Sequence, residues 1–519
     1  MAEVLWDVAP RYAGRPCLTD LDAPEPSTLD YGRLLQRVAA IAAGFLDLGL
    51  GAGDRVALLM HNSTAYVEAW LGAVAAGLVV VPLNVRLTGD DYLHMLKDSG
   101  TKVLVTTGEF LERVPVLSGI AGLAVVQADG AGHDLTLAGL AARARPLRAP
   151  VHREGTDTAS LMYTSGTTGL PKAVMLSHNS WRSVAETAIA VLGMAADEVT
   201  LHVAPLTHGA GFLMLPTLLL GGHNLVCRSF DAGRTLALIT ERGVTGMFVV
   251  PSMIRMLLDA RPQEWLVPPS LRRLYYAGSP IDAETIREAT VVFDGRLIQS
   301  FAQMESPMFF TVLDQADHGR ILANPESPLV RSAGRVLPGV RLRISDDAGA
   351  TLGVNEAGEI LAQAPQTMTG YWGRPRETEE TLADGWLHTG DVGYLDEDGY
   401  LYIVDRKKDM IVTGGSNVYA REVEDVLNGL PGVREAAVIG LPHRIWGEAV
   451  TAVLVSDDGA CDSDAVIAAC REKLAGYRVP KAVYWVDELP RNAYGKVLKR
   501  RLRERFAAQQ PPLSPAAGR

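Results

Sequence analysis

The chain has 519 residues, of which 48% are hydrophobic and 21% charged, and its formal net charge is −11. This length exceeds one ordinary core, so roughly two to four globular units are expected. The acidic balance argues against non-specific nucleic-acid binding, although a nucleotide can still bind in a local basic site. The four cysteines are scattered without a CxxC pair, which argues against a zinc site and favours a reducing cytoplasm.

The first part of the chain alternates between helical and strand-like patterns. Helices are expected over 34–48, 64–76 and 180–192, and strands over 55–60, 78–81, 102–106, 199–205 and 271–276. Thr88 and Asp91 form a capping-box pattern before a further helix. Gly77 and Pro82 interrupt the apolar run 66–83, which favours a helix and a strand over a membrane span. Repeated strand–helix–strand units predict an α/β fold with parallel sheets covered by helices.

The pattern of predicted elements changes in the second part of the chain. Short β segments from about Ser332 onward, such as 340–344, 358–362 and 400–404, predict a β-rich subdomain. The last unit is expected to contain helices at 420–427 and 463–474 and strands at 436–439, 450–455 and 483–486. We therefore predict a large domain over 1–405, a small α+β domain over 406–508 and a disordered tail over 509–519.

Residues 163–172, Tyr-Thr-Ser-Gly-Thr-Thr-Gly-Leu-Pro-Lys, have the composition of a phosphate-binding loop. Glycines let the backbone wrap a ligand, hydroxyls donate hydrogen bonds and lysine adds positive charge. The apolar flanks predict that the loop joins two strands. The spacing is not that of a Walker A motif, and a plain polar hairpin turn is the other interpretation. The predicted phosphate-binding residues are Thr164, Ser165, Gly166, Thr167, Thr168, Gly169 and Lys172.

This loop resembles the signature loop of the adenylate-forming superfamily, which includes acyl- and aryl-CoA synthetases, peptide-synthetase adenylation domains and luciferases. The segment Ser300-Phe-Ala-Gln-Met-Glu305 resembles the next motif, in which the resemblance implies that Phe301 stacks on adenine and Glu305 holds Mg²⁺. Ala302 and Met304 stand where the family usually has glycine and threonine. The threonine's contact with the α-phosphate must therefore come from elsewhere or be absent. The nucleotide-binding residues of this segment are Phe301, Ala302, Gln303, Met304 and Glu305.

Further motifs follow in the family's order over roughly residues 20–505. Gly278 and Ser279 resemble the loop against adenine. Asp391, in Trp386-Leu-His-Thr-Gly-Asp391, would accept hydrogen bonds from both ribose hydroxyls. The resemblance also implies that Arg406 contacts the ribose and that Lys408 is the hinge of the C-terminal domain, whereas a solvated turn is the ordinary interpretation of this basic run.

The last motif, Leu489-Pro-Arg-Asn-Ala-Tyr-Gly-Lys496, carries the implied catalytic lysine. Lys496 would bridge the acid's carboxylate and the α-phosphate. An exposed surface lysine is the other interpretation. His208, in Pro205-Leu-Thr-His-Gly-Ala-Gly211, would act as a gate where the acyl pocket meets the CoA tunnel, although a lone histidine in such a loop is more often structural.

The resemblance also implies sites for CoA and for the acid. Gly414 and Gly415 would line a pantetheine tunnel, and Trp446, Tyr477 and Arg478 would hold the CoA nucleotide. The implied acid-pocket walls are apolar and partly aromatic, which favours a hydrophobic aryl, cyclic or medium-chain acid. These walls are Phe212, Phe248, Val250, Tyr276, Ala277, Pro307 and Met308, together with Phe301.

The resemblance implies an AMP-forming carboxylate–CoA ligase that uses ATP, Mg²⁺ and CoA. Its C-terminal domain would rotate about Lys408 between adenylate formation and thioester formation. Free CoA is favoured as the acceptor, because the chain ends soon after Lys496. An amine or a carrier-protein thiol is the second hypothesis, and a catalytically silent nucleotide-binding relative is the third. Homodimers are common among such enzymes, but the sequence does not indicate the oligomeric state.

Overall fold

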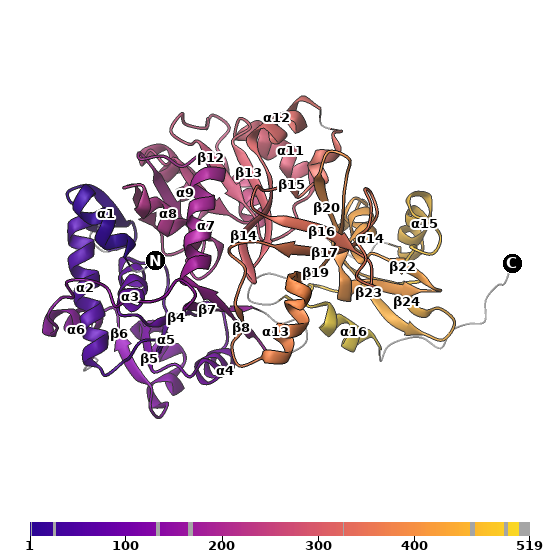
Figure 1. The fold of residues 1–519 in the computed structure, drawn as a ribbon. Coiled ribbons are helices and arrows are strands. Elements are labelled where there is room, and N and C mark those ends of the chain that lie inside the picture. The colour runs from indigo at the N-terminus through magenta and orange to yellow at the C-terminus, as the bar shows by residue number, and fades with distance from the viewer. Residues whose placement is uncertain are drawn as a thin grey trace. The chain divides into compact units, whose positions relative to one another are not determined.

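The structure, a computed structural model, describes residues 1, 3–23, 27–130, 135–164, 170–324, 326–456, 462–491 and 497–507 (Figure 1). The contacts within the chain divide it into two units. Unit 1 comprises residues 1–342, 362–388 and 399–401, and unit 2 comprises residues 343–361, 389–398 and those from 402 onward. The predicted division at 405/406 stays a prediction, and the predicted disordered tail lies outside the described residues.

The first sheet of unit 1 has seven strands in the order β18-β8-β7-β4-β3-β5-β6. Its strands are β3 (Arg55–Leu59), β4 (Val79–Pro82), β5 (Val103–Thr106), β6 (Ala124–Gln127), β7 (Thr158–Thr164), β8 (Lys172–Ser177) and β18 (Gly370–Tyr371). Val56 and Leu58 join one apolar cluster, whereas Ala57 and Leu59 join another. Because side chains alternate across a strand, both faces of this sheet are buried, as expected for parallel strands.

Helices of unit 1 surround this sheet (Figure 1). They include α2 (Tyr31–Asp47), α3 (Thr64–Ala75), α4 (Gly89–Ser99) and α5 (Gly108–Arg113). The predicted capping box is present, because the Thr88 side chain accepts from the Asp91 backbone while the Asp91 side chain accepts from the Thr88 backbone. The apolar run 66–83 forms α3 and β4, as predicted. No helix in the described parts of the chain has the length and apolar content needed to cross a bilayer.

The second sheet of unit 1 runs in the order β15-β14-β13-β12-β11-β9-β10-β1-β2. Its strands are β1 (Pro16–Asp20), β2 (Ser27–Asp30), β9 (Val199–His202), β10 (His223–Val226), β11 (Gly246–Val249), β12 (Arg273–Tyr276), β13 (Leu297–Gln303), β14 (Ser306–Leu313) and β15 (Gly334–Val336). The neighbours from β13 to β1 in this order are parallel, and β2, β14 and β15 are antiparallel additions. The carboxyl ends of six strands therefore meet at one edge.

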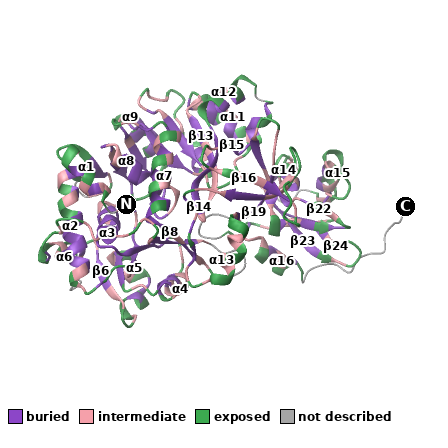
Figure 2. Ribbon diagram, viewed as in Figure 1, coloured by how far each residue is buried: buried purple, intermediate pink, exposed green. Residues whose placement is uncertain are grey.

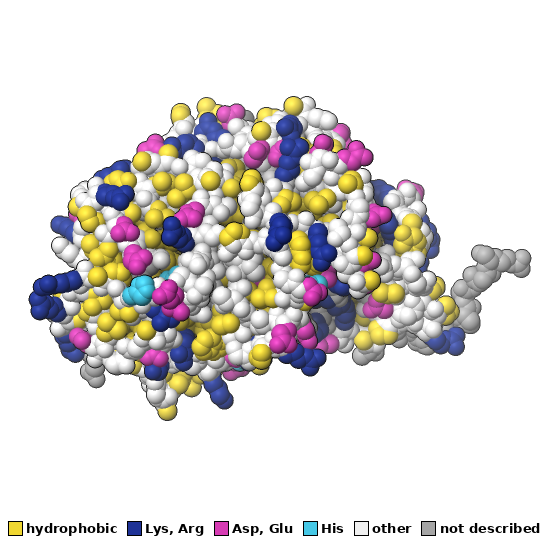
Figure 3. All heavy atoms as spheres, viewed as in Figure 1, with side chains coloured by type: hydrophobic (Ala, Val, Ile, Leu, Met, Phe, Trp, Pro, Cys, Tyr) yellow, Lys and Arg dark blue, Asp and Glu magenta, His cyan; other side chains and the backbone are white. Residues whose placement is uncertain are grey.

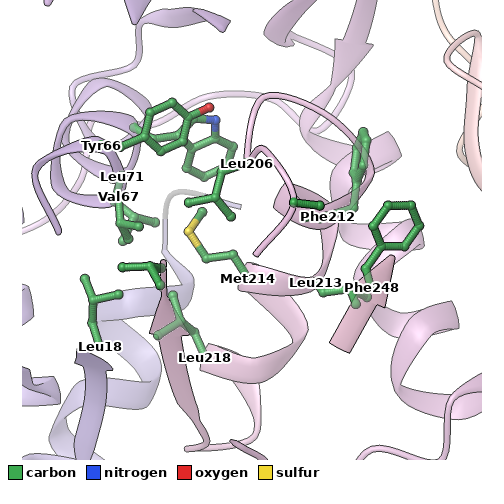
Figure 4. Close-up of a cluster of buried hydrophobic side chains, with 14 of the residues drawn as sticks. Leu18, Tyr66, Val67, Leu71, Leu206, Phe212, Leu213, Met214, Leu218 and Phe248 are labelled. Atoms are coloured by element: carbon green, nitrogen blue, oxygen red, sulfur yellow. The ribbon is translucent and has the colours of Figure 1, made fainter. Parts of the chain in front are cut away.

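The other helices of unit 1 are α1 (Val4–Tyr12), α6 (Leu137–Arg143), α7 (His178–Val191), α8 (Met214–Leu219), α9 (Ala232–Glu241), α10 (Pro251–Ala260), α11 (Ala283–Val292), α12 (Gln315–Ala323) and α13 (Pro375–Thr381), with the short η2 (Gly209–Leu213). Most of them have both buried and exposed residues, whereas α8 is almost entirely buried and α13 has no buried residue (Figure 2). Figure 4 shows part of the core that they enclose, where side chains from β1, α3, α8, η2 and β11 pack together. On the face drawn in Figure 3, acidic and basic side chains are interspersed.

Unit 2 contains most residues of four strands in the order β16-β17-β19-β20, and a second sheet in the order β22-β21-β24-β23 with β25 beside β24. The strands are β16 (Arg341–Ser345), β17 (Gly358–Gln363), β19 (Leu387–Leu395), β20 (Tyr400–Arg406), β21 (Ile411–Thr413), β22 (Ser416–Val418), β23 (Val433–His443), β24 (Gly447–Ser456) and β25 (Ala482–Trp485). Helices α14 (Ala420–Asn428) and α15 (Ser463–Lys473) pack on one face of the second sheet, and α16 (Lys499–Ala507) packs on the other. This α+β arrangement, and the α/β arrangement of unit 1, confirm the predicted fold class.

Candidate active site

The predicted phosphate loop starts and ends on paired strands. Thr164 at the end of β7 lies opposite Lys172 at the start of β8, and the Thr164 hydroxyl donates to the Lys172 carbonyl over 3.4 Å. Ser165, Gly166, Thr167, Thr168 and Gly169 lie outside the described residues. The flanking strands confirm the predicted strand–loop–strand connection.

Helix α4 contacts both ends of this loop. The Tyr163 hydroxyl lies 2.8 Å from Asp98 Oδ2, and Arg374 donates to the other oxygen of the same carboxylate over 2.8 Å. At the far end, His94 Nε2 lies 3.3 Å from the carbonyl oxygen of Pro171, the residue before Lys172. The two ends of the loop are therefore fastened to one rigid helix.

Glu305 lies in the tight turn between the antiparallel strands β13 and β14. Its Oε1 accepts a hydrogen bond from the Tyr371 hydroxyl over 2.7 Å. Lys172 Nζ lies 4.3 Å from the centre of the same Tyr371 ring. The structure thus brings together two predicted site residues, Lys172 and Glu305, around a tyrosine that the sequence did not single out.

The donor set around Glu305 suits a magnesium ion that is bound together with phosphates. Among the described residues there is no group of three or more His, Cys, Asp or Glu side chains that could hold a metal ion by itself. Mg²⁺ commonly takes one or two carboxylates and completes its shell with substrate phosphates and water. Glu305 beside Lys172 fits that pattern.

The predicted adenine-side residues lie at the carboxyl ends of neighbouring parallel strands. The register pairs Val249 with Tyr276 and Tyr276 with Gln299, so the residues that follow these three positions begin side by side. Gly278 has a φ of +96°, a backbone conformation that favours glycine, and a Cβ at this position would lie 3.8 Å from Val250 Cγ1. Ligands of α/β sheets bind at such an edge. Phe301, Ala302 and Gln303 end β13, Met304 follows in the turn, and Ser279 lies exposed beside Gly278.

The predicted acid-pocket residues form a largely buried apolar set near the same edge. Phe248 packs so closely over Gly209 that a Cβ there would lie 2.6 Å from its ring, which explains the glycine after His208. Phe212 stacks on Trp181 with ring centres 4.4 Å apart (Figure 4 shows Phe212 and Phe248). Their role in binding the acid stays a prediction, as it does for the other members: Val250, Tyr276, Ala277, Pro307 and Met308.

Met308 has an unusual backbone conformation, and the hydroxyl of Tyr276 lies close to polar atoms inside the protein. Met308 has a φ of +73°, in the left-handed region that residues other than glycine rarely adopt. The Tyr276 hydroxyl lies 3.1 Å from His318 Nε2 and 3.3 Å from Gln299 Oε1, so its polar end is already engaged inside the protein. A ligand at this edge would therefore meet the apolar part of Tyr276.

His208 lies beside a cleft of about 390 Å³ in unit 1. Its Nδ1 is 2.9 Å from the hydroxyl of Thr207, which lines the cleft. Burial, with a smaller contribution from Arg86, lowers the pKa of His208 to about 4, so the imidazole is neutral at pH 7. Three arginines also line the cleft, and they are too far apart in the sequence to form a recognisable motif: Arg86, Arg113 and Arg228.

Buried histidines predict that this protein loses stability in mild acid. Burial lowers the pKa values of His202, His208 and His318 from 6.5 to about 4. Between these pH values the unfolded chain binds more protons than the folded chain, so the free energy of unfolding falls as the pH falls from 6.5 towards 4. We expect about 1 kcal/mol per histidine for each pH unit, measured as urea unfolding at pH 7, 6 and 5. The variant His318→Gln should show a shallower pH slope, and an unchanged slope would contradict this account.

The predicted ribose site in unit 2 is a carboxylate held by an arginine. Asp391 on β19 is 3% exposed, and its Oδ1 lies 2.5 Å from Nε of Arg406 on the neighbouring strand β20. The Asp391 backbone N–H donates to Thr389 Oγ1 over 3.1 Å, which fixes the strand locally. The structure therefore brings the two predicted ribose residues into direct contact.

Replacing Asp391 with asparagine should weaken ATP binding. Asparagine loses the charge that strengthens hydrogen bonds to ribose hydroxyls, each worth roughly 1.5–3 kcal/mol. We expect the KM for ATP in acid-dependent pyrophosphate exchange to rise about 10- to 100-fold, with the KM for the acid unchanged. Wild type should discriminate against 2′- and 3′-deoxy-ATP, and Asp391→Asn should discriminate much less. Equal discrimination by both proteins would exclude a ribose contact.

The predicted CoA residues of unit 2 gather around Trp446. Gly414 and Gly415 form the turn between β21 and β22 with φ values of +58° and +81°, a hairpin geometry that favours glycine. The Gly414 N–H donates to the Trp446 carbonyl over 2.8 Å, and Trp446 is 37% exposed. Lys481 Nζ lies 5.4 Å from the Trp446 ring centre and donates to the Gly476 carbonyl over 2.9 Å, next to the exposed Tyr477.

Three further predicted residues remain to be placed: Arg478, Lys408 and Lys496. The Arg478 guanidinium lies 5.2 Å from the Tyr477 ring centre and forms an ion pair with Glu422. Lys408 is exposed in the short helix η5 (Lys407–Asp409), and its role as a hinge stays a prediction. Lys496 lies outside the described residues. Lys481 was missed because an isolated lysine outside any motif gives no chemical signal.

Comparison with known proteins assigns the chain to a family. The model of the AMP-binding enzyme family matches residues 5–372, and that of the AMP-binding enzyme C-terminal domain matches residues 422–496. A feruloyl-CoA synthase from Amycolatopsis sp is 40% identical, over 92% of this chain and 94% of its own length. A fatty acid–[acyl-carrier-protein] ligase, ScoC from Streptomyces coeruleorubidus, is 36% identical over 93% and 92%. The crystal structure of ATP-bound MatB from Rhodopseudomonas palustris superposes with a TM-score of 0.86 at 30% identity and covers 98% of this chain and 99% of its own. The chain therefore belongs to the AMP-binding enzyme family, in the acyl-CoA synthetase branch of the adenylate-forming superfamily.

Proposed function

We propose that this enzyme converts a hydrophobic carboxylic acid, ATP and CoA into acyl-CoA, AMP and pyrophosphate through an acyl-adenylate. The observation that carries the proposal is the convergence of Lys172, from the end of the phosphate loop, and Glu305 on the Tyr371 side chain. A cation and a hard carboxylate at one point are what a metal-bound polyphosphate requires.

The chemistry follows from groups of this chain. A carboxylate oxygen of the acid attacks the α-phosphorus of ATP, and the bond to pyrophosphate breaks. Lys172 balances charge on the leaving phosphates, Asp391 orients the ribose, and Lys496 brings the two anionic reactants together. Mg²⁺, held by Glu305, would neutralise charge on the phosphates. In the second half-reaction the CoA thiol loses its proton and attacks the acyl carbon, and AMP leaves.

The acid is proposed to be hydrophobic, with an aryl acid as the first candidate. The pocket residues Phe212, Phe248 and Met308 are buried and apolar. The names of the two relatives refer to a feruloyl group and to fatty acids, which are both largely apolar acids. A panel of ferulate, benzoate, octanoate, palmitate, malonate and acetate should rank the hydrophobic members first in acid-dependent pyrophosphate exchange.

Free CoA is proposed as the acceptor. Trp446 is partly exposed and stacks on His443, and Lys481 lies beside its ring, so aromatic surface and positive charge that suit a nucleotide with several phosphates lie together. In unit 1, Arg86 and Arg113 add positive charge to the cleft beside His208, whereas Arg228 forms an ion pair there with Glu109. The name of the Streptomyces relative refers to a carrier protein, which keeps a carrier-protein thiol as the second candidate.

One incubation separates these acceptors. The purified protein is mixed with the best acid of the panel, Mg-ATP and CoA, holo acyl-carrier protein or hydroxylamine, and products are identified by mass spectrometry. Acyl-CoA formed at the rate of AMP release supports the proposal. Transfer to the carrier protein alone reassigns the acceptor, and the absence of both AMP and pyrophosphate would reject the whole function.

The cytoplasm, as the proposed location, fits Cys17, Cys227 and Cys470, which are buried free thiols.

A further inference from the structure

Tyr371 connects the two charged groups that the proposed function places at the phosphates. Its hydroxyl donates to Glu305 Oε1 over 2.7 Å, and its ring faces Lys172 Nζ at 4.3 Å. The side chain is buried, with 5% exposed. A single residue therefore contacts the phosphate-loop lysine on its ring face and the metal-binding carboxylate at its polar end.

Backbone hydrogen bonds fix Tyr371 in this place. It lies on β18, which pairs with β8 so that Tyr371 is opposite Val174, two residues after Lys172. The Tyr371 N–H donates to Thr378 Oγ1 over 2.9 Å. On the same segment, the Met368 N–H donates to the Glu305 carbonyl over 2.7 Å. The segment 368–371 thus holds Glu305 by both its backbone and its side chain.

The residue before Tyr371 leaves little room for another arrangement. Gly370 has a φ of +148°, and a Cβ there would lie 2.7 Å from Thr378 Cγ2 and 3.1 Å from its Oγ1. Any side chain would push away the hydroxyl that accepts from Tyr371. Glycine at this position therefore allows Thr378 to hold the Tyr371 backbone.

The hydrogen bond has a defined direction. A carboxylate only accepts hydrogen bonds, so the Tyr371 hydroxyl is the donor and Glu305 Oε1 the acceptor over 2.7 Å. This hydrogen bond engages one carboxylate oxygen, Oε1, and Oε2 is the oxygen that would contact a metal ion. Hydrogen bonds of this kind to a metal ligand set its orientation and commonly change metal affinity 10- to 100-fold.

We infer that Tyr371 is a positioning residue that orients the Glu305 carboxylate for the magnesium of Mg-ATP and holds Lys172 beside the same phosphates. This inference rests on the proposed function. The hydroxyl of Tyr371 serves metal binding through Glu305, and its ring holds Lys172. A substitution can therefore remove the hydroxyl alone or the hydroxyl together with the ring.

The variant Tyr371→Phe removes the hydroxyl and keeps the ring. We expect the affinity for Mn²⁺, measured by electron paramagnetic resonance in the presence of α,β-methylene-ATP, to fall about 10-fold or more. Binding of α,β-methylene-ATP in EDTA, measured by calorimetry, should stay within about twofold of wild type, because Lys172 still contacts the ring. Tyr371→Leu should weaken binding in EDTA as well.

The matched control is Tyr31→Phe, which also removes a buried hydroxyl. The Tyr31 hydroxyl lies 2.8 Å from the Gly222 carbonyl and 3.1 Å from that of Leu218, in the α2 region of the core. This variant should lose stability and keep wild-type Mn²⁺ affinity. Wild-type Mn²⁺ affinity in Tyr371→Phe, or an equal loss in Tyr31→Phe, would overturn the inference. If the wild-type protein itself binds no Mn²⁺ with the nucleotide, the proposed function fails instead.

Discussion

Lys496→Ala is expected to lose nearly all adenylate formation while keeping thioester formation from a preformed adenylate. The first half-reaction joins two anions, the acid and the α-phosphate, and a lysine ammonium between them lowers that barrier electrostatically. Removing one such preorganised donor commonly costs about 100- to 1,000-fold in rate. Acid-dependent pyrophosphate exchange should therefore fall by at least about 100-fold. Synthetic acyl-adenylate with CoA should still give acyl-CoA at a rate within a few-fold of wild type.

The control for this prediction is Lys473→Ala. Lys473 is exposed at the end of α15, so its loss should change neither half-reaction. If Lys496→Ala slows both half-reactions equally, the residue serves the fold or both steps, and the assignment to adenylation is wrong. If neither half-reaction slows, Lys496 is an ordinary surface lysine and the match to the last motif has no catalytic meaning.

Glu305→Gln is expected to reduce pyrophosphate exchange by roughly 100- to 1,000-fold, because a metal ion contributes several kcal/mol to charge stabilisation and glutamine binds it poorly. The amide oxygen can still accept from the Tyr371 hydroxyl, so the turn between β13 and β14 should stay intact. The rate should rise with Mg²⁺ up to much higher concentrations than in wild type. Measuring exchange against Mg²⁺ concentration tests this.

Glu264→Gln is the corresponding control, since Glu264 is exposed in the segment after α10. It should keep the wild-type Mg²⁺ dependence. A variant Glu305→Gln with a reduced rate but an unchanged Mg²⁺ dependence would point to a role other than metal binding. Unfolding by urea at pH 7 should be measured for both variants, so that a loss of stability is not mistaken for a loss of the metal site.

Local patterns predicted much of the architecture. The apolar spacing indicated α2 and α3 to within a few residues, and the Thr88–Asp91 pair indicated where α4 starts, because capping and periodicity are local effects. The strand expected at 436–439 is longer, since β23 runs over Val433–His443. Its pairing with β24 extends from Val433 opposite Ser456 to His443 opposite Gly447. The apolar residues of one strand do not show how far its partner strand extends, so the length of β23 could not be predicted from them.

The candidate site was predicted through motifs, and what lies outside motifs was missed. Lys172, Glu305 and Asp391 are in strings with recognisable chemistry. Tyr371 is 66 positions from Glu305, and the two meet only because β18 pairs with β8 beside the β13–β14 turn. Arg113 and Arg228 reach one cleft from α5 and from the end of β10 for the same reason. Convergence of this kind depends on sheet order, which the sequence patterns did not give.

Under the proposed assignment of Met308 to the acid pocket, its left-handed backbone has a consequence for how the acid specificity of this enzyme can change during evolution. Shortening a buried methionine normally costs about 2–5 kcal/mol, so a larger pocket usually reduces the fraction of folded protein. A glycine at position 308 would also release backbone strain of roughly 1–3 kcal/mol. A mutation that admits a bulkier acid at this position is therefore less harmful to the fold than at Phe248, where the backbone is an ordinary strand. We expect natural and laboratory variants with larger substrates to arise first at Met308.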